Sequence, residues 1–204
     1  MRIGLIAPPF ISVPPKDYGG TELFIAQLAE GLQKRGLEVV VYANGESTVG
    51  VEKRWIYPAA QWPIKVDGHY FLKDIEHSAW ATQNAASCCD LLHVHAAPAL
   101  TYSRFAHLPM VCTLHGPHDS RLSEIYAHYP QVNYVCISRS QCRQESMPRM
   151  RTIHHGIDLA CYELRIQKQD YLSFIGRIAP IKGVHLAIDV AKRAGIPLKI
   201  AGDV

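Results

Sequence analysis

The 204-residue sequence lacks an uninterrupted apolar stretch of the roughly 20 residues that a membrane-spanning helix needs. It also carries little excess charge, because 21 lysines and arginines oppose 18 acidic residues and leave a net charge of +3. A surplus this small does not indicate binding to nucleic acid or to an acidic membrane. The chain runs from Met1 directly into an apolar segment, so a secretory signal is not expected.

Cysteine occurs at six positions, but no pair has the Cys-x-x-Cys spacing of many zinc and redox sites. Several of the six fall within predicted strands and helices, scattered along the chain. This pattern favours reduced thiols in a cytoplasmic protein over disulfides or structural zinc. The six are Cys88, Cys89, Cys112, Cys136, Cys142 and Cys161.

Three further motifs are absent. No Gly-x-Gly-x-x-Gly fingerprint follows the first predicted strand, which disfavours a nicotinamide-dependent oxidoreductase. No Gly-x-Ser-x-Gly elbow occurs, which disfavours a hydrolase of that type. No Asp-x-Asp occurs, and the nearby carboxylates Asp90 and Asp119 form no ligand motif with the histidines, so no metal site is predicted. The histidines concerned are His93, His95, His118, His154 and His155.

Apolar, β-branched segments alternate with segments of helical spacing along most of the chain. This alternation predicts an α/β protein with a parallel sheet and helices on both faces, whose ligands bind at the carboxyl ends of the strands. The predicted strands cover residues 2–7, 37–43, 54–60, 91–95, 109–115, 133–138, 150–154, 171–177 and 197–201. The predicted helices cover residues 22–36, 74–87, 99–107, 120–129, 140–147 and 182–194.

Two stretches weaken this pattern. Residues 61–72 are aromatic and irregular and give no clear prediction. The helix over 74–87 has only a loose apolar stripe of Ile75, Ala79 and Ala86, which the polar residues Thr82 and Gln83 interrupt.

Two domains are predicted. Residues 1–158 form the first, residues 159–170 read as a mixed, charged linker, and residues 171–204 begin a second βαβ unit. A unit of this size cannot bury a core of its own. Its open strand edges therefore predict self-association or domain swapping through residues 165–204.

A glycine pair, Gly19-Gly20, follows the first predicted strand and a proline-rich loop. A strand, a glycine turn and a helix start together present unpaired N–H groups and a positive dipole end to an anion. Glycines also let a phosphate approach the main chain closely. The residues by themselves leave two interpretations open, an anion site or a simple turn. Glu22 in the first turn suits the dipole whatever the function, which favours a structural role for it.

Six short motifs occur in order along the chain. They are Pro15-Lys16-Asp17-Tyr18-Gly19-Gly20-Thr21-Glu22, Leu91-Leu92-His93-Val94-His95, Thr113-Leu114-His115-Gly116, Ile137-Ser138, His155-Gly156-Ile157-Asp158, and Gly176-Arg177 followed by Lys182-Gly183. The set resembles the retaining glycosyltransferases of family 4 (group 1), which have the GT-B fold, and the resemblance covers the whole chain. It implies two Rossmann-like domains, of which the N-terminal one usually holds the acceptor and the C-terminal one the nucleotide-diphosphate sugar.

The resemblance also implies roles for individual residues. Gly19 and Gly20 match the loop that faces the donor diphosphate, and Arg177 and Lys182 match the basic pair that neutralises it. Fixed cations suit this step, because the departing nucleoside diphosphate gains negative charge in the transition state. His115 matches the catalytic-site histidine beside the donor sugar, where its expected role is a hydrogen bond to a sugar hydroxyl or to the reacting region rather than full proton abstraction. The donor is a substrate, so no cofactor is expected.

The family's nucleotide-binding domain is expected to extend well past Val204. Three accounts remain open: a fragment of a longer transferase, which is favoured, one half of a split transferase, or a short protein that only binds an acceptor or assembles with a partner. The chain alone is expected to have little or no transferase activity. Sugar, base and acceptor are not identified. Aromatic candidates for an acceptor-facing surface are Trp55, Tyr57, Trp62, His69, Tyr70 and Phe71, which the sequence does not distinguish from core residues.

Overall fold

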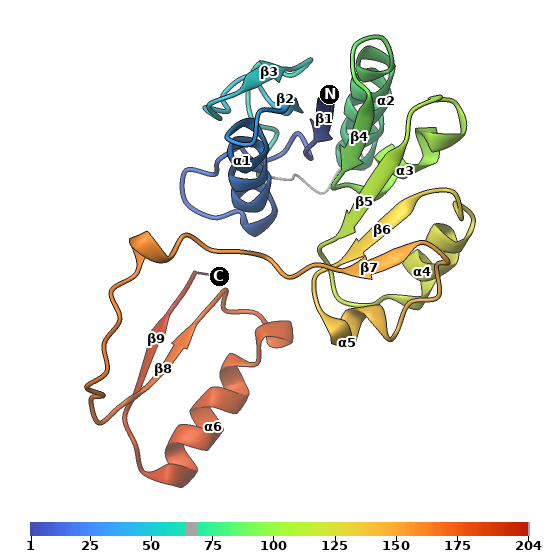
Figure 1. Ribbon diagram of the computed structural model, residues 1–204. Coiled ribbons are helices and arrows are strands. Elements are labelled where there is room, and N and C mark those ends of the chain that lie inside the picture. Colours follow the sequence, from blue (N-terminus) through green and yellow to red (C-terminus); the bar gives the residue numbers. More distant parts are fainter. Residues whose placement is uncertain (64–68, 204) are drawn as a thin grey trace. The chain divides into compact units, whose positions relative to one another are not determined.

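The computed structural model describes residues 1–63 and 69–203 and divides the chain into two units, Met1–Gly156 and Ile157–Val204 (Figure 1). The first unit contains a seven-stranded sheet and the second a two-stranded sheet. None of the helices in the described residues is both long enough and apolar enough to cross a membrane. All six cysteines are free thiols.

The large sheet is parallel throughout, with the strand order β3-β2-β1-β4-β5-β6-β7. The order reverses direction between β1 and β4, so this is the predicted α/β fold of the Rossmann-like, doubly wound type. The strands are β1 (Arg2–Ile6), β2 (Glu38–Tyr42), β3 (Glu52–Arg54), β4 (Leu91–Val94), β5 (Met110–Leu114), β6 (Asn133–Cys136) and β7 (Met150–Thr152).

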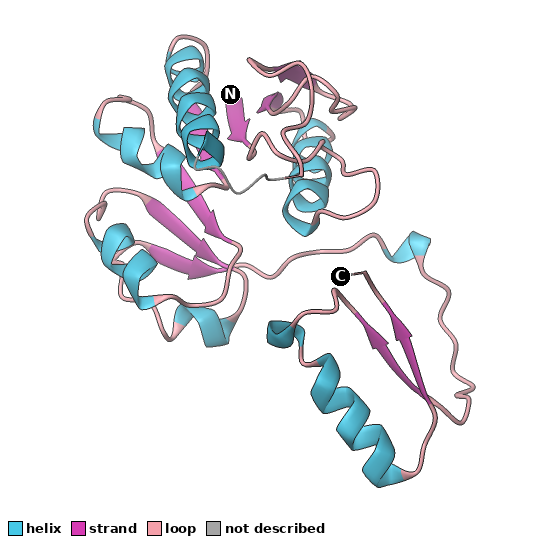
Figure 2. Cartoon of the chain, turned by 180° about the vertical axis from the view of Figure 1, so that it is seen from behind, coloured by secondary structure: helices cyan, strands magenta, loops and turns pink. Residues whose placement is uncertain are grey.

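Helices cover both faces of this sheet (Figures 1 and 2). Helix α1 (Gly20–Gln33) packs on one face, and the connections after β3 run over the other, because right-handed crossovers change face where the strand order reverses. The remaining helices of the unit are α2 (His69–Ala86), α3 (Ala97–Thr101), η1 (Tyr102–Arg104), α4 (Ser120–Ala127) and α5 (Arg139–Cys142).

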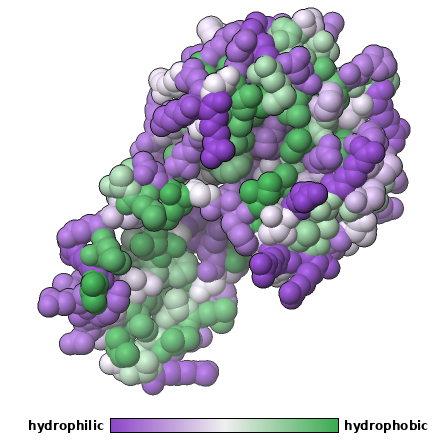
Figure 3. Space-filling model, viewed as in Figure 1, coloured by the Kyte–Doolittle hydropathy of each residue, from purple (hydrophilic) through white to green (hydrophobic). Residues whose placement is uncertain are grey.

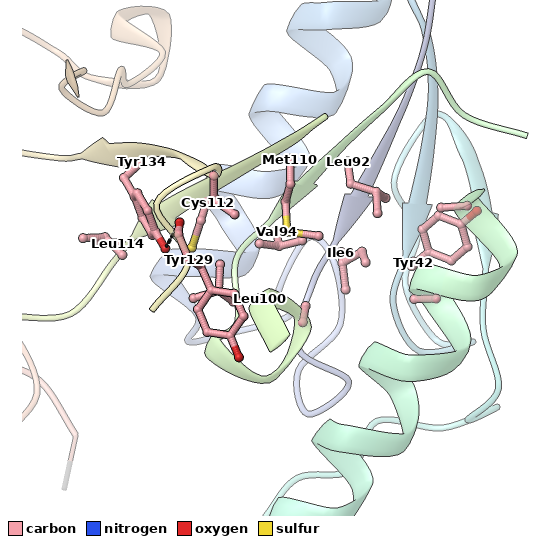
Figure 4. Packing of buried hydrophobic residues seen from close by; sticks show 14 of the residues in the cluster. Ile6, Tyr42, Leu92, Val94, Leu100, Met110, Cys112, Leu114, Tyr129 and Tyr134 are labelled. Carbon is pink, nitrogen blue, oxygen red and sulfur yellow. Dashed lines mark hydrogen bonds between the residues drawn. The ribbon is translucent and has the colours of Figure 1, made fainter. Parts of the chain in front are cut away.

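Two hydrophobic clusters lie on opposite faces of the sheet. Successive side chains of a strand point to opposite faces, so Leu5 packs against α1 while Ile6 packs on the other side. The cluster on the side of α2 continues across β4 and β5 to Tyr134 in β6, as Figure 4 shows. The buried Tyr134 hydroxyl donates hydrogen bonds to the carbonyl oxygens of Tyr126 and Tyr129, at 2.9 and 3.3 Å.

The third strand is shorter and earlier than the sequence predicts. It covers Glu52–Arg54, and the predicted residues 55–60 are not in a strand. Instead, this segment packs on the turn after β2, where the N–H of Gly45 donates to the carbonyl oxygen of Tyr57 at 2.8 Å. A Cβ atom at Gly45 would collide with the carbonyl oxygen of Pro58, so the contact requires glycine.

The prediction for the second helix is wrong in its start and in its buried face. The helix begins at His69, and residues 64–68 of the stretch without a clear prediction lie outside the described residues. Its buried residues are His77, Ser78, Ala81, Thr82 and Ala85, not the apolar stripe that the sequence suggests. Apart from His77, the buried side chains of this face are small, a packing effect that hydrophobicity alone does not reveal.

The predicted helix over 140–147 is also too long, because α5 covers only Arg139–Cys142. Pro148 lies shortly beyond, and the residue before a proline disfavours helical geometry. The side chain of Gln141 donates to the carbonyl oxygens of Leu114 and Gly116, at 3.0 and 2.6 Å. Gln141 of this short helix therefore stabilises the end of β5 through two hydrogen bonds.

The second unit is a single βαβ element. Strands β8 (Leu172–Ile175) and β9 (Leu198–Ala201) pair in parallel, and α6 (Val184–Ala194) connects them. Short 3-10 turns, η2 (Leu159–Cys161) and η3 (Pro180–Lys182), precede β8 and α6.

Candidate functional site

The candidate site of the first unit lies where the strand order reverses, at the carboxyl ends of β1, β4 and β5. The loop after β1 leads into α1, His95 follows β4, and His115 follows β5. Ligands of doubly wound folds bind at such an edge, because the chain leaves neighbouring strands toward opposite faces and leaves a crevice between them.

The glycine pair begins α1, and its two members differ. Gly19 is buried with φ +157°, and a Cβ atom there would lie 2.9 Å from Pro15 Cβ. Gly20 is exposed, and an added Cβ would meet nothing within 4 Å in the described part of the chain. Gly19 is therefore required by packing, while the space in front of Gly20 is open. The first N–H groups of α1 have no helical partners, as at every helix start.

Polar residues after β2 hold the proline-rich loop in place. Asn44 is fully buried and donates through Nδ2 to the Pro9 carbonyl oxygen at 3.2 Å. Ser47 Oγ accepts a 2.9 Å hydrogen bond from the N–H of Val13. In the sequence these two residues resemble ordinary turn residues, and only the fold shows that they anchor the loop before Gly19.

Glu22 is 6% exposed and points back toward Gly19. Burial raises the pKa of Glu22, and a hydrogen bond from its own main-chain N–H opposes that shift. The carboxyl group thus uses one of the N–H groups at the start of α1, an arrangement that fits its structural interpretation.

Hydrogen bonds between β4 and β5 join three histidines and a threonine. His93 Nε2 lies 2.7 Å from Thr113 Oγ1, and His95 Nδ1 lies 3.0 Å from His115 Nε2. All four side chains occupy odd-numbered positions on the face of the sheet that packs α1. The spacing of His93 and His95 predicts their common face, but the partner strand is set by the tertiary fold.

Aromatic rings complete this group. Phe24 of α1 lies with its ring centroid 5.3 Å from that of His115 and 4.2 Å from that of His155. His155 also stacks on His115, at 5.4 Å between centroids. The sequence does not predict a place for Phe24 in the site, because an apolar residue in a helix is equally expected in the hydrophobic core. We call Phe24, His93, His95, Thr113, His115 and His155 the histidine cluster.

The histidine cluster is uncharged near neutral pH. Burial lowers the pKa of His93 and that of His115 to about 4, and it lowers the pKa of His95 further. Neighbouring imidazoles add to the shifts of His95 and His115, since each would repel a second positive charge. The cluster can therefore offer neutral hydrogen-bonding groups and ring faces. Among the described residues, no group of three or more histidines, cysteines and carboxylates is arranged to hold a metal ion.

The predicted basic residues belong to the second unit. Arg177 follows β8 and Lys182 ends η3, directly before the start of α6, and both side chains are exposed. Gly183 between η3 and α6 has φ +74°, a left-handed conformation that favours glycine. Strand end, turn and helix start thus place both cations on neighbouring segments of one βαβ element.

None of the six aromatic candidates for an acceptor surface is buried. Trp55, Trp62 and Phe71 are 45%, 55% and 60% exposed. Tyr70 stacks on Phe10 of the loop after β1, with 4.1 Å between ring centroids. Tyr70 and Phe10 thus connect α2 with the same loop that leads to Gly19.

A protein-family comparison assigns residues 18–160, well over half of the chain, to the family described as Glycosyltransferase Family 4. The chain belongs to this family. The matched range contains Gly19, Gly20 and the whole histidine cluster. A search of curated protein sequences found no match.

Solved structures similar to this family 4 chain share its fold at low sequence identity. HepE from Anabaena, in complex with UDP and glucose, is 17% identical with a TM-score of 0.68, covering 99% of this chain and 61% of HepE. AviGT4, a glycosyltransferase involved in avilamycin A biosynthesis, is 23% identical with a TM-score of 0.62, covering 98% and 56%. Sucrose-phosphate synthase from Thermosynechococcus elongatus is 14% identical with a TM-score of 0.72, covering 98% and 62%. The chain thus spans less than two thirds of the length of each.

The buried histidines predict a pH-dependent stability for this family 4 chain. Burial lowers the pKa of His93 from its ordinary value of 6.5, which applies to the unfolded chain, to about 4 in the folded chain. As the pH falls, His93 therefore binds a proton in the unfolded chain before it does so in the folded chain. Stability is therefore lost as pH falls from about 6.5 to 4. Between pH 7 and 5 we expect the wild type to lose about 1–2 kcal/mol more unfolding free energy than His93→Gln, measured by chemical denaturation.

The comparison between variants is needed because burial raises the pKa of Asp74 to about 6, which changes stability with pH in the opposite sense. Asp74 is present in both proteins, so its effect cancels. His107→Gln, at an exposed histidine, is the control and should keep the wild-type pH dependence. Equal slopes for the wild type and His93→Gln would contradict the prediction.

Proposed function

We propose that the chain contributes to a retaining glycosyltransferase that moves a sugar from a nucleotide-diphosphate sugar to an acceptor. The observation that carries this proposal is the family match over residues 18–160, because it includes Gly19, Gly20 and His115 together. The solved complex of HepE with UDP-glucose supports a uridine nucleotide sugar as the first donor to test.

In this proposal the positive side chains stabilise the negative charge that develops on the leaving group. Departure of the nucleoside diphosphate builds negative charge, which Arg177 and Lys182 stabilise more in the transition state than in the bound substrate. Gly19 and Gly20 offer main-chain N–H groups to a diphosphate. His115 is neutral, so it donates a hydrogen bond to the donor sugar and adds no positive charge of its own. The reaction requires no metal ion or further cofactor.

We propose the corresponding division of the chain. Residues 1–158 hold the acceptor side, residues 159–170 link the domains, and residues 171–204 begin the nucleotide-binding side. The six free thiols support a reducing, cytoplasmic location for this carbohydrate-biosynthetic role.

Replacing Arg177 should weaken nucleotide binding. Loss of its charge-assisted contacts in Arg177→Ala should reduce the affinity for UDP tenfold or more, which corresponds to about 1.4 kcal/mol. Calorimetric titration with UDP, GDP and ADP measures this effect and identifies the preferred base.

Arg193→Ala is the matched control, since Arg193 is exposed in the last turn of α6, at the opposite end of that helix from Lys182. It should bind as tightly as the wild type. Equal losses in both variants would indicate a general charge effect and contradict a diphosphate role for Arg177. Absence of binding by every nucleotide would favour an acceptor-side or assembly module.

The chain by itself should show little or no transfer. It covers 61% of HepE, so much of the framework present in that protein has no counterpart here. A sensitive assay with a panel of nucleotide sugars measures release of the nucleoside diphosphate by the isolated chain. Clear turnover would contradict this prediction while supporting the enzyme class.

A second candidate function, an assembly module, is favoured by the apolar surface of the second unit. Ile175, Ile181 and Leu186 are 84%, 71% and 60% exposed. Figure 3 shows apolar side chains on the visible surface of this unit. Exposed apolar groups on a two-stranded sheet with open edges promote pairing with another chain.

We therefore predict self-association through residues 165–204. The weight-average mass, measured by analytical ultracentrifugation across micromolar concentrations, should rise with concentration, and Ile175→Lys should reduce the rise. Phe105→Lys serves as the control, because Phe105 is 77% exposed in the first unit. A constant monomeric mass for the wild type would contradict the prediction.

A further inference from the structure

His95 is buried and makes a single side-chain hydrogen bond. The residue is 7% exposed, and its Nδ1 atom lies 3.0 Å from His115 Nε2. Its other ring nitrogen, Nε2, is sealed from solvent and has no hydrogen-bond partner within residues 1–63 and 69–203. The titratable groups that act on it are the imidazoles of His93, His115 and His155.

A hydrogen bond between two neutral imidazoles needs one N–H donor and one nitrogen acceptor. If His115 donated through Nε2, the proton of His95 would have to reside on the sealed Nε2 atom. That arrangement buries an N–H group without a partner, which native proteins rarely do. If His95 donates through Nδ1, the sealed atom carries a lone pair and no proton. The second arrangement gives the N–H of His95 a partner and leaves only an acceptor lone pair unpaired at Nε2.

The choice at His95 determines the tautomer of His115. Because His115 Nε2 accepts the hydrogen bond, the ring proton of His115 resides on Nδ1. The structure describes no hydrogen bond at that atom, and it is not among the polar atoms sealed without a partner. The Nδ1–H group is thus the side of His115 available to a ligand.

We propose that His95 is a positioning residue that holds His115 in the Nδ1–H tautomer, so that His115 offers a ligand one hydrogen-bond donor. The recognised chemistry is an oxygen acceptor, either a sugar hydroxyl or a phosphate oxygen. In this form His115 cannot accept a proton through Nδ1, so it orients the ligand and does not act as a base from that atom. The identity of the ligand rests on the proposed function, whereas the tautomer does not.

The tautomer can be measured directly by two-bond proton–nitrogen correlation spectra of the chain with ¹⁵N-labelled histidine, with His115→Gln used to assign the signals. We expect the wild-type chain to show His115 protonated at Nδ1, although free imidazole side chains in water prefer Nε2–H. In the His95→Asn variant the side-chain amide nitrogen would occupy the place of Nδ1, so this variant should preserve the tautomer. His95→Leu removes the donor and should shift His115 toward Nε2–H.

His93→Gln is the matched control, because His93 lies on the same strand face but bonds to Thr113 and not to His115. It should leave the His115 tautomer unchanged. Nε2–H at His115 in the wild type, or no change in a folded His95→Leu variant, overturns the proposal. If His95→Leu fails to fold, the wild-type spectrum still decides between the two tautomers.

Titrations with UDP and with UDP-glucose show whether the oxygen that accepts the hydrogen bond from His115 belongs to the sugar or to a phosphate. If the acceptor is a sugar hydroxyl, His95→Leu should weaken UDP-glucose binding about threefold to tenfold and leave UDP binding unchanged, with His95→Asn restoring the affinity. Equal losses for both ligands would identify a phosphate oxygen. No binding of either ligand to the wild type would count against the proposed function, and the spectra would still decide the role of His95.

Discussion

Parallel pairing of β1, β4 and β5 is the constraint on which both the core and the candidate site depend. Successive side chains of these strands point to opposite faces, so the sequence is divided between two environments. Leu92, Val94 and Cys112 enter the core beneath α2 and α3. His93, His95 and Thr113 face the side of α1, where the strand order reverses and the candidate site lies. A shift of one residue in register would exchange the two sets and destroy both.

Burial makes the histidine cluster a neutral, directional group. Desolvation keeps the imidazoles uncharged, and the hydrogen bonds to Thr113 and between His95 and His115 orient the rings. Positive charge is supplied elsewhere in the chain, by Arg177 and Lys182 of the second unit. In the proposed function, the two kinds of chemistry would address different parts of a nucleotide sugar: neutral donors recognise hydroxyl groups, whereas fixed cations recognise phosphates.

Fold similarity and family membership contribute different kinds of support. The solved structures compared above are at most 23% identical, so they show the architecture alone, and the ligand of HepE serves only to choose the first donor to test. The family match covers the residues that carry the candidate chemistry in the first unit. The second unit consists of one βαβ element, and it exposes large apolar residues such as Ile175 and Leu186.

The sequence by itself determined the α/β class, the order of most strands and helices, the glycine turn and the common face of His93 and His95. These features follow from local periodicity and turn chemistry, which act over a few residues. Only the tertiary structure decided the bond between His95 and His115, the stacking of Phe24 and His155, the anchoring of the loop by Asn44, and the polar buried face of α2. These depend on contacts between residues distant in the chain, where packing and burial override local propensity.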